Sequence, residues 1–158
     1  TKVSLTVPIT LAIVQALIVE VAGRTMAIPL SAVREVFRLE PMSVSLVEAR
    51  ETTTLRGRSL PICRLCERFG IGAKTDGRRD YVVLAVHGSR RLGFTVDRVT
   101  GQRDIIIKSL GSSLKRIRGV SGATDLGDRN LALVLDPPFL IEDFFGTVQP
   151  PAKAEATR

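Results

Sequence analysis

The sequence predicts an all-β fold, either a barrel or a sandwich. Short apolar runs with the composition of strands dominate the chain, and glycines that favour tight turns separate many of them. A single segment near the C-terminus carries a strong helix signal. A chain of 158 residues is long enough for one domain or for two small intertwined subdomains.

The first half of the chain is expected to form strands joined by glycine turns. Residues 31–39 are ambiguous between a short helix and a strand. A hairpin is expected around Gly23, and Gly57 interrupts a long stretch rich in β-branched residues. The expected strands lie at residues 5–13, 16–23, 24–30 and 44–62.

The second half opens with a short helical turn at residues 65–72, which Gly70 ends, and a polar loop at residues 73–80. A strand pair is expected to turn near Gly88, and a hairpin around Gly127 and Asp128, a dipeptide type favoured in tight turns. The expected strands lie at residues 81–88, 90–99, 102–110 and 122–136.

The predicted helix begins after Asp136, a residue type that caps helix N-termini, with Pro137 at the first helical position. Gly146 is expected to end it. An apolar stripe along the helix consists of Phe139, Leu140, Phe144 and Phe145.

Composition restricts the classes of partner. Hydrophobic residues make up 44% of the chain, yet no apolar run reaches the roughly 18 residues that a membrane span needs. The start shows no signal-peptide pattern, so a cytoplasmic location and no membrane insertion are expected.

The formal net charge of +7 fits nucleic acid, an anionic membrane or an acidic protein surface as a partner. One Tyr and no Trp argue against a base-stacking platform, and therefore against nucleic acid. The basic segments at residues 56–79 and 103–118 are interpreted either as a solvated face or as a docking face for acidic partners.

Two features that often carry chemistry are assigned other roles. Cys63 and Cys66 form a CxxC motif, but a zinc site needs four ligands and the chain has no further Cys and a single His. They are expected to be small buried hydrophobes without a disulfide. His87 ends a predicted strand and has no nucleophile motif beside it in sequence. We therefore expect a binding or scaffolding module with no catalytic residues, no metal and no cofactor.

Four segments together resemble the CheW-like domain of bacterial chemotaxis proteins. They follow the family's order and cover about residues 14–145. The segments are "MAIPLSAVREVFRL", "LRGRSLPICRL", "RRLGFTVDRVTGQRDIIIKSL" and "GVSGATDLGDRNLALVLD".

The opening "VPITLAI" is similar to the end of the ATP-binding domain in CheA-type chemotaxis histidine kinases, which leads into their C-terminal regulatory domain. On this resemblance, residues 1–13 are a seam strand from an upstream domain. Residues 14–146 are the CheW-like regulatory domain in two subdomains, and residues 147–158 are a disordered tail.

The resemblance implies two intertwined five-stranded SH3-like barrels followed by a short helix. It implies binding to a CheW-type adaptor and to the cytoplasmic tip of chemoreceptors, which couples receptor signals to autophosphorylation by the upstream kinase domain of the same polypeptide. The ATP site and the phospho-accepting histidine are then expected upstream. Two alternatives remain: a free-standing CheW-type adaptor, and a basic nucleic-acid-binding β-barrel.

Partner-binding residues are expected in two segments. Val33 and Val36 are predicted to form an apolar ridge, with Glu35 as a polar selector. Gly57 allows a bend, and Arg56 pairs either with an acidic residue across a subunit contact or with one inside the chain. Core packing is the alternative role of the two valines. The core of the first barrel is expected to contain Leu60, Pro61 and Ile62.

Overall fold

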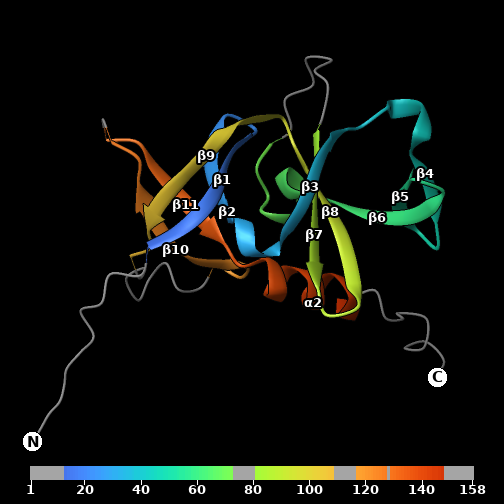
Figure 1. Ribbon diagram of the computed structural model, residues 1–158. Helices are drawn as coiled ribbons and strands as arrows, with labels where there is room; N and C mark the ends of the chain where they lie inside the picture. The colour runs from blue at the N-terminus through green and yellow to red at the C-terminus, as the bar shows by residue number, and fades with distance from the viewer. Residues whose placement is uncertain (1–12, 73–80, 109–116, 128, 148–158) are drawn as a thin grey trace, which may run out of the picture.

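Two β-sheets form the body of the protein (Figure 1). The computed structural model describes residues 13–72, 81–108, 117–127 and 129–147. The first sheet has the strand order β10-β11-β2-β1-β9, with bounds Val120–Asp125, Leu131–Leu135, Arg24–Pro29, Ile13–Val21 and Arg98–Ile106. The second has the order β3-β7-β8-β6-β5-β4, with bounds Val33–Arg38, Tyr81–His87, Arg90–Val96, Arg58–Arg64, Arg50–Leu55 and Ser45–Val47.

The first sheet closes into a barrel. Directly after β9, Lys108 and Ala123 of β10 exchange two backbone hydrogen bonds, with N–O distances of 2.8 and 3.0 Å. Gly122 permits this close approach, because a Cβ atom there would lie 2.6 Å from the carbonyl oxygen of Lys108 and 2.6 Å from Cγ2 of Ile107. The absence of a side chain at Gly122 is therefore a requirement of barrel closure.

The two sheets are intertwined along the chain. Strands β1 and β2 begin the first sheet, strands β3 to β8 build the second, and β9 to β11 return to the first. Helix α2 (Pro137–Thr147) then packs against β7 and β8 of the second sheet. The remaining helical elements are short: η1 (Leu30–Ala32), η2 (Pro41–Ser43) and α1 (Leu65–Arg68).

Apolar side chains form three clusters. The largest lies between the sheets and joins residues of both to helix α2, including Leu17, Met26, Phe94 and Ile141. A second cluster belongs to the first sheet, and a third, with Leu60 and Ile62, to the second. Strands β1 and β7 contribute to two clusters each, so both of their faces are buried, and their sequences are continuously apolar for that reason.

The structure confirms the predicted all-β class, the main hairpins and the cap of the last helix. The backbone N–H of Phe139 donates to Oδ1 of Asp136 at 3.3 Å. Helix α2 continues through Gly146 to Thr147, one residue beyond the predicted end. Leu140 and Ile141 of this helix are fully buried and Pro137 is buried as well, whereas the phenylalanines are half-buried.

Other expectations need correction. The ambiguous segment 31–39 contains the end of η1 and strand β3. The second sheet has six strands, because the short β4 is added at its edge. Leu60 and Ile62 are buried as predicted but belong to the second sheet, and Pro61 is half-buried. Strand β1 begins at Ile13.

Several predicted segments lie outside the described residues. They are residues 1–12 of the expected seam strand, the polar loop at residues 73–80, Asp128 of the hairpin turn, and residues 148–158 of the expected tail.

Candidate partner-binding site

The predicted residues Glu35 and Arg56 form an ion pair within the chain. Arg56 and Gly57 make the turn between β5 and β6, with positive φ angles of 50° and 78°. This conformation favours glycine at position 57, where no neighbouring atom would obstruct a side chain. The guanidinium of Arg56 donates two hydrogen bonds to the carboxylate of Glu35 on β3, at 2.6 and 2.9 Å. The pair therefore links the hairpin turn to strand β3.

Val33 and Val36 have different surroundings, although they were predicted to share one ridge. Val33 is half-buried and packs against the cluster between the sheets. Val36 is 37% exposed on the same strand and belongs to none of the three clusters. This part of the second sheet therefore offers Val36 as an apolar contact, while Val33 supports the core.

Strand β4 presents further apolar side chains that the sequence analysis did not single out. Leu46 is 73% exposed, Val47 is 50% exposed, and Met42 on the preceding η2 is 98% exposed. Among the described strands, β4 is the edge of its sheet and pairs with β5 alone. We call Met42, Leu46 and Val47 the β4 edge. A sequence signal for it exists in the adjacent apolar pair Leu46 and Val47, which breaks strand alternation.

The first sheet also exposes apolar side chains. Ile13 of β1 and Ile106 of β9 are direct cross-strand partners and are 66% and 37% exposed, respectively. Leu131, at the start of β11, is 67% exposed. In Figure 1 the first sheet and strand β4 lie on opposite sides of the molecule. Both sides therefore carry apolar side chains without a partner in the described parts of the chain.

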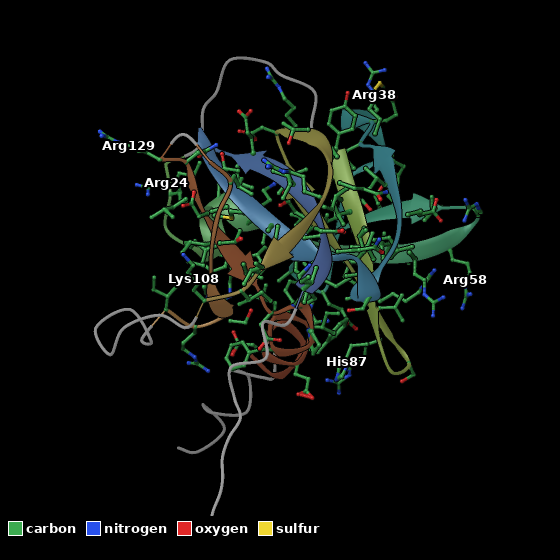
Figure 2. The ribbon with its side chains drawn as sticks, turned by 60° about the vertical axis from the view of Figure 1, so that its left-hand side comes forward. Arg24, Arg38, Arg58, His87, Lys108 and Arg129 are labelled. Atoms are coloured by element: carbon green, nitrogen blue, oxygen red, sulfur yellow. The ribbon has the colours of Figure 1, made fainter. Side chains whose placement is uncertain are left out.

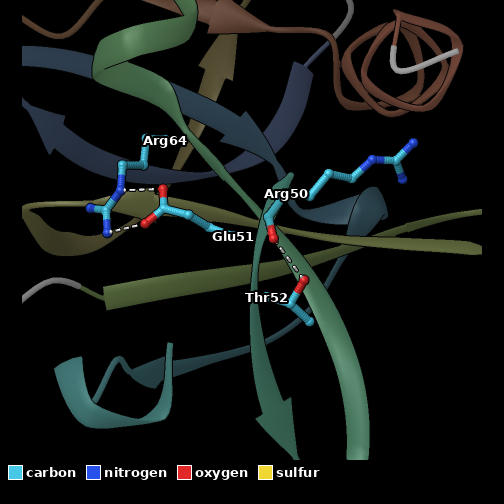
Figure 3. Close-up of polar contacts among 4 residues, drawn as sticks. All are labelled: Arg50, Glu51, Thr52 and Arg64. Atoms are coloured by element: carbon cyan, nitrogen blue, oxygen red, sulfur yellow. Dashed lines mark hydrogen bonds and ion pairs between the residues drawn. The ribbon is translucent and has the colours of Figure 1, made fainter. Parts of the chain in front are cut away.

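Strand β5 is anchored on both sides (Figure 3). Glu51 accepts two hydrogen bonds from Arg64 of β6, at 2.6 and 2.8 Å, and the side chain of Arg50 points the other way. The Arg50 guanidinium lies 5.4 and 5.3 Å from the ring centroids of Phe144 and Phe145 in helix α2. Thr52 Oγ1 donates to the carbonyl oxygen of Arg50 at 3.3 Å. These contacts hold the sheet that carries the β4 edge against helix α2.

The basic side chains are spread over the surface. Figure 2 shows Arg24 and Arg129 at one end of the molecule and Arg58 at the other. Several carboxylates are already engaged: Asp143 with both Arg68 and Arg118, and Glu20 with Arg98. The charge does not form one continuous stripe among the labelled residues.

The two cysteines are free thiols in apolar surroundings. Cys63 is buried in the cluster between the sheets, and burial raises the pKa of its thiol from 9.0 to about 12. Burial also raises the pKa of Cys66, which packs against the same cluster. Both thiols are therefore protonated at neutral pH, which disfavours nucleophilic or metal-binding roles. In the described ranges, no three His, Cys, Asp or Glu residues gather closely enough to hold a metal ion.

Replacing Cys63 by Val and Cys66 by Ala is expected to lower the free energy of unfolding at neutral pH by less than about 1.5 kcal/mol, since both side chains act by packing.

Above pH 9 the wild type is expected to lose stability relative to Cys63→Val. The unfolded thiol deprotonates at its ordinary pKa of 9.0, while the folded one keeps its proton up to about 12. The contribution of the protonated Cys63 thiol to the free energy of unfolding is therefore complete below pH 9, and it falls by about 1.4 kcal/mol for each pH unit above 9.

Urea unfolding of the wild type and of Cys63→Val, each at about pH 8 and at about pH 10, measures the difference in their free energies of unfolding. Parallel loss of stability in the wild type and in Cys63→Val would contradict the assignment to the Cys63 thiol.

His87 lies at the end of β7, as predicted, and its Nε2 is 3.5 Å from Oε1 of Glu142 on helix α2. The Glu142 side chain is largely exposed, and that of His87 is partly exposed. The contact adds a link between the helix and the second sheet.

None of the helices in the described ranges is long and apolar enough to cross a membrane.

Comparison with known proteins gives consistent matches. The model of the CheW-like domain family matches residues 15–145. The sensor histidine kinase CheAY of Helicobacter pylori is 39% identical over 137 residues, which cover 86% of this chain and 17% of that protein. The chemotaxis protein CheA of Bacillus subtilis is 32% identical over 139 residues, covering 87% of this chain and 21% of that protein.

Among solved structures, the crystal structure of the scaffolding protein TtCheW from Thermoanaerobacter tengcongensis has a similar fold. The TM-score is 0.67 at 22% identity, and the match covers 83% of this chain and 94% of that chain. The present chain thus spans about a fifth of the length of the kinases it matches, but nearly all of the scaffolding protein.

Proposed function

The chain belongs to the CheW-like domain family, and from this premise we propose that it is the regulatory domain of a CheA-type chemotaxis histidine kinase. In this role it binds a CheW-type adaptor and the cytoplasmic tip of chemoreceptors. It couples the state of the receptor to autophosphorylation by a kinase domain in the same polypeptide. The domain itself carries no catalytic residues and works in the cytoplasm.

The observation that carries this proposal is the presence of exposed apolar side chains on both sheets. Val36 and the β4 edge lie on the second sheet, and Ile13, Ile106 and Leu131 on the first. A domain with two such sides is suited to connect neighbours in an array. The kinship with the kinases supports the regulatory role over that of a free-standing adaptor.

Each single contact is expected to be weak. One end of a small β-barrel offers modest area, and interfaces below about 1,200 Å² are typical of transient encounters. Many such contacts within an array would supply tight assembly through multivalency. The apolar side chains provide most of the affinity, because exposed ion pairs contribute only about 0–1 kcal/mol.

The Glu35–Arg56 pair acts as a polar selector beside Val36 in this proposal. Arg56→Ala is expected to lower the free energy of unfolding by less than about 1 kcal/mol, since the Arg56 side chain is 73% exposed. It is also expected to weaken adaptor binding less than a charge placed at Val36, and the effect should shrink in high salt. Titrations with the adaptor at low and high salt measure the loss of affinity, with Glu35→Gln as the matched variant. An effect of Arg56→Ala that persists in high salt would contradict a role through exposed charge.

The test of the proposed function is calorimetric titration of this chain with a CheW-type adaptor from the same organism, followed by a kinase assay. Added in excess, the free chain is expected to compete for adaptor and to lower receptor-dependent autophosphorylation of the full kinase. Absence of adaptor binding, or an unchanged kinase signal, would refute the proposal. An upstream reading frame without a kinase domain would favour the free-standing adaptor.

A further inference from the structure

A basic notch opens on the second sheet between strand β6 and the turn from β7 to β8. The parallel pairing of β6 with β8 covers only Ile62 to Arg64, opposite Gly93 to Thr95. Before this stretch the two strands are not paired with each other, and a hollow of about 510 Å³ lies there. Pro61 and Phe145 give it apolar walls, and its polar lining is Arg58, Arg90, Arg91, Ser59 and Ser89. We call this hollow the arginine notch.

The charge of the notch is not compensated within the described part of the chain. No carboxylate there forms an ion pair with Arg58, Arg90 or Arg91. The carboxylates on neighbouring elements have other partners. Glu142 lies against His87, and Asp143 is held by Arg68 and Arg118. The notch is therefore lined by three arginines that no described carboxylate pairs with and by two serines, a lining that suits an incoming anion.

One wall of the notch is preorganised by aromatic contacts. The guanidinium of Arg90 lies 5.3 Å from the ring centroid of Phe145, and that of Arg50 lies at the same distance. The ring of Phe145 packs edge-on against Phe144, with centroids 5.4 Å apart. Arg90 is thereby held in place before a ligand arrives. Preorganisation lowers the conformational entropy lost on binding.

We propose that the arginine notch binds an acidic segment of a protein partner through its carboxylate groups. Guanidinium groups bind carboxylates with paired, charge-assisted hydrogen bonds. The hollow is open and much larger than a single anionic group, so several side chains of an extended segment fit into it. The unpaired edges of β6 and β8 beside it suit such a segment.

Other anionic partners fit less well. Single-stranded nucleic acid needs aromatic faces for its bases, and Phe145 already contacts Phe144 and two arginines. A membrane surface calls for exposed apolar side chains among the basic ones, and the apolar walls Pro61 and Phe145 are both half-buried. The proposal shares no residue with the apolar contacts of the proposed function and does not depend on them.

The experiment measures binding of a short fluorescein-labelled peptide of alternating Glu and Ser to the 158-residue chain by fluorescence anisotropy. The same peptide with Gln in place of every Glu is the ligand control. The test variant is Arg58→Glu/Arg91→Glu. The matched variant is Arg24→Glu/Arg129→Glu, which changes the net charge equally at the other end of the molecule.

The Glu peptide is expected to bind and the Gln peptide not to bind. The notch variant should lose at least about tenfold in affinity, and the matched variant less than about twofold. Equal losses in both variants would overturn the proposal, because binding would then follow net charge alone. Stronger notch-dependent binding of inorganic phosphate, single-stranded DNA or phosphatidylserine vesicles would also overturn it. If circular dichroism shows that the notch variant is unfolded, Arg58→Gln/Arg91→Gln replaces it with the same expectation.

Discussion

Replacing Val36 by Asp is expected to weaken binding of a CheW-type adaptor at least about tenfold while the domain stays folded. A tenfold loss corresponds to about 1.4 kcal/mol. Full burial of an exposed valine side chain contributes about 1.5–3 kcal/mol, so burying the 37% of Val36 that is exposed supplies only a part of the loss. An unpaired carboxylate buried in the contact adds a further desolvation cost. Val36 is 37% exposed and lies outside all three apolar clusters, so the free domain tolerates the charge. Calorimetric titration with the adaptor and circular dichroism measure both effects.

Two further variants identify the cause. Val33→Asp is expected to destabilise the fold, because Val33 packs against the cluster between the sheets. Gln102→Asp adds the same charge to an exposed position of β9 in the other sheet and is expected to leave this contact unchanged. Unfolding of Val36→Asp would show that Val36 is part of the core. Wild-type affinity in a folded Val36→Asp would place the contact elsewhere, with Leu46→Asp on the β4 edge as the next variant.

Gly122→Ala is expected to lower the free energy of unfolding by about 2–5 kcal/mol. The new Cβ atom would lie 2.6 Å from the carbonyl oxygen of Lys108, so the backbone after β9 must move away from β10. Overpacking of this kind costs about 1–3 kcal/mol. The two hydrogen bonds between Lys108 and Ala123 that close the barrel are weakened as well, each contributing about 0.5–1.5 kcal/mol. Urea unfolding followed by circular dichroism gives the change.

Gly146→Ala is the matched control. Position 146 lies in helix α2 with open space around it, and no positive φ is recorded there. The same added methyl group is expected to leave stability unchanged or to raise it by up to about 1 kcal/mol, because alanine favours the helix. Equal stability of Gly122→Ala and the wild type would mean that the barrel closes without the close approach at residue 122.

Local sequence patterns predicted much of the fold. The last helix begins after Asp136 as expected, because capping depends on a side chain and an N–H group only three residues apart. The turn at Arg56 and Gly57 follows from glycine's freedom at positive φ. The resemblance also brought Glu35 and Arg56 together as site residues, and the structure places them in one ion pair. The length of α2 and the number of strands in the second sheet differed from expectation because element ends depend on neighbours.

The sequence by itself determined the all-β class, the hairpins, the family and the burial of Cys63, since these follow from composition, short-range geometry and motif order. Cys66, expected to be buried as well, is only partly buried. The tertiary structure decided which apolar side chains face outward. Val33 and Val36 look equivalent in sequence, yet only Val33 packs against the cluster between the sheets. Leu46 and Val47 are exposed because β4 is a sheet edge, and the arginine notch exists because β6 and β8 pair over only three residues. The placement of the two valines and the arginine notch depend on pairing between strands distant in the chain, β3 with β7 and β6 with β8. Strand β4 pairs with its neighbour β5, and its edge position depends on no other described strand joining it. No local pattern encodes these outcomes.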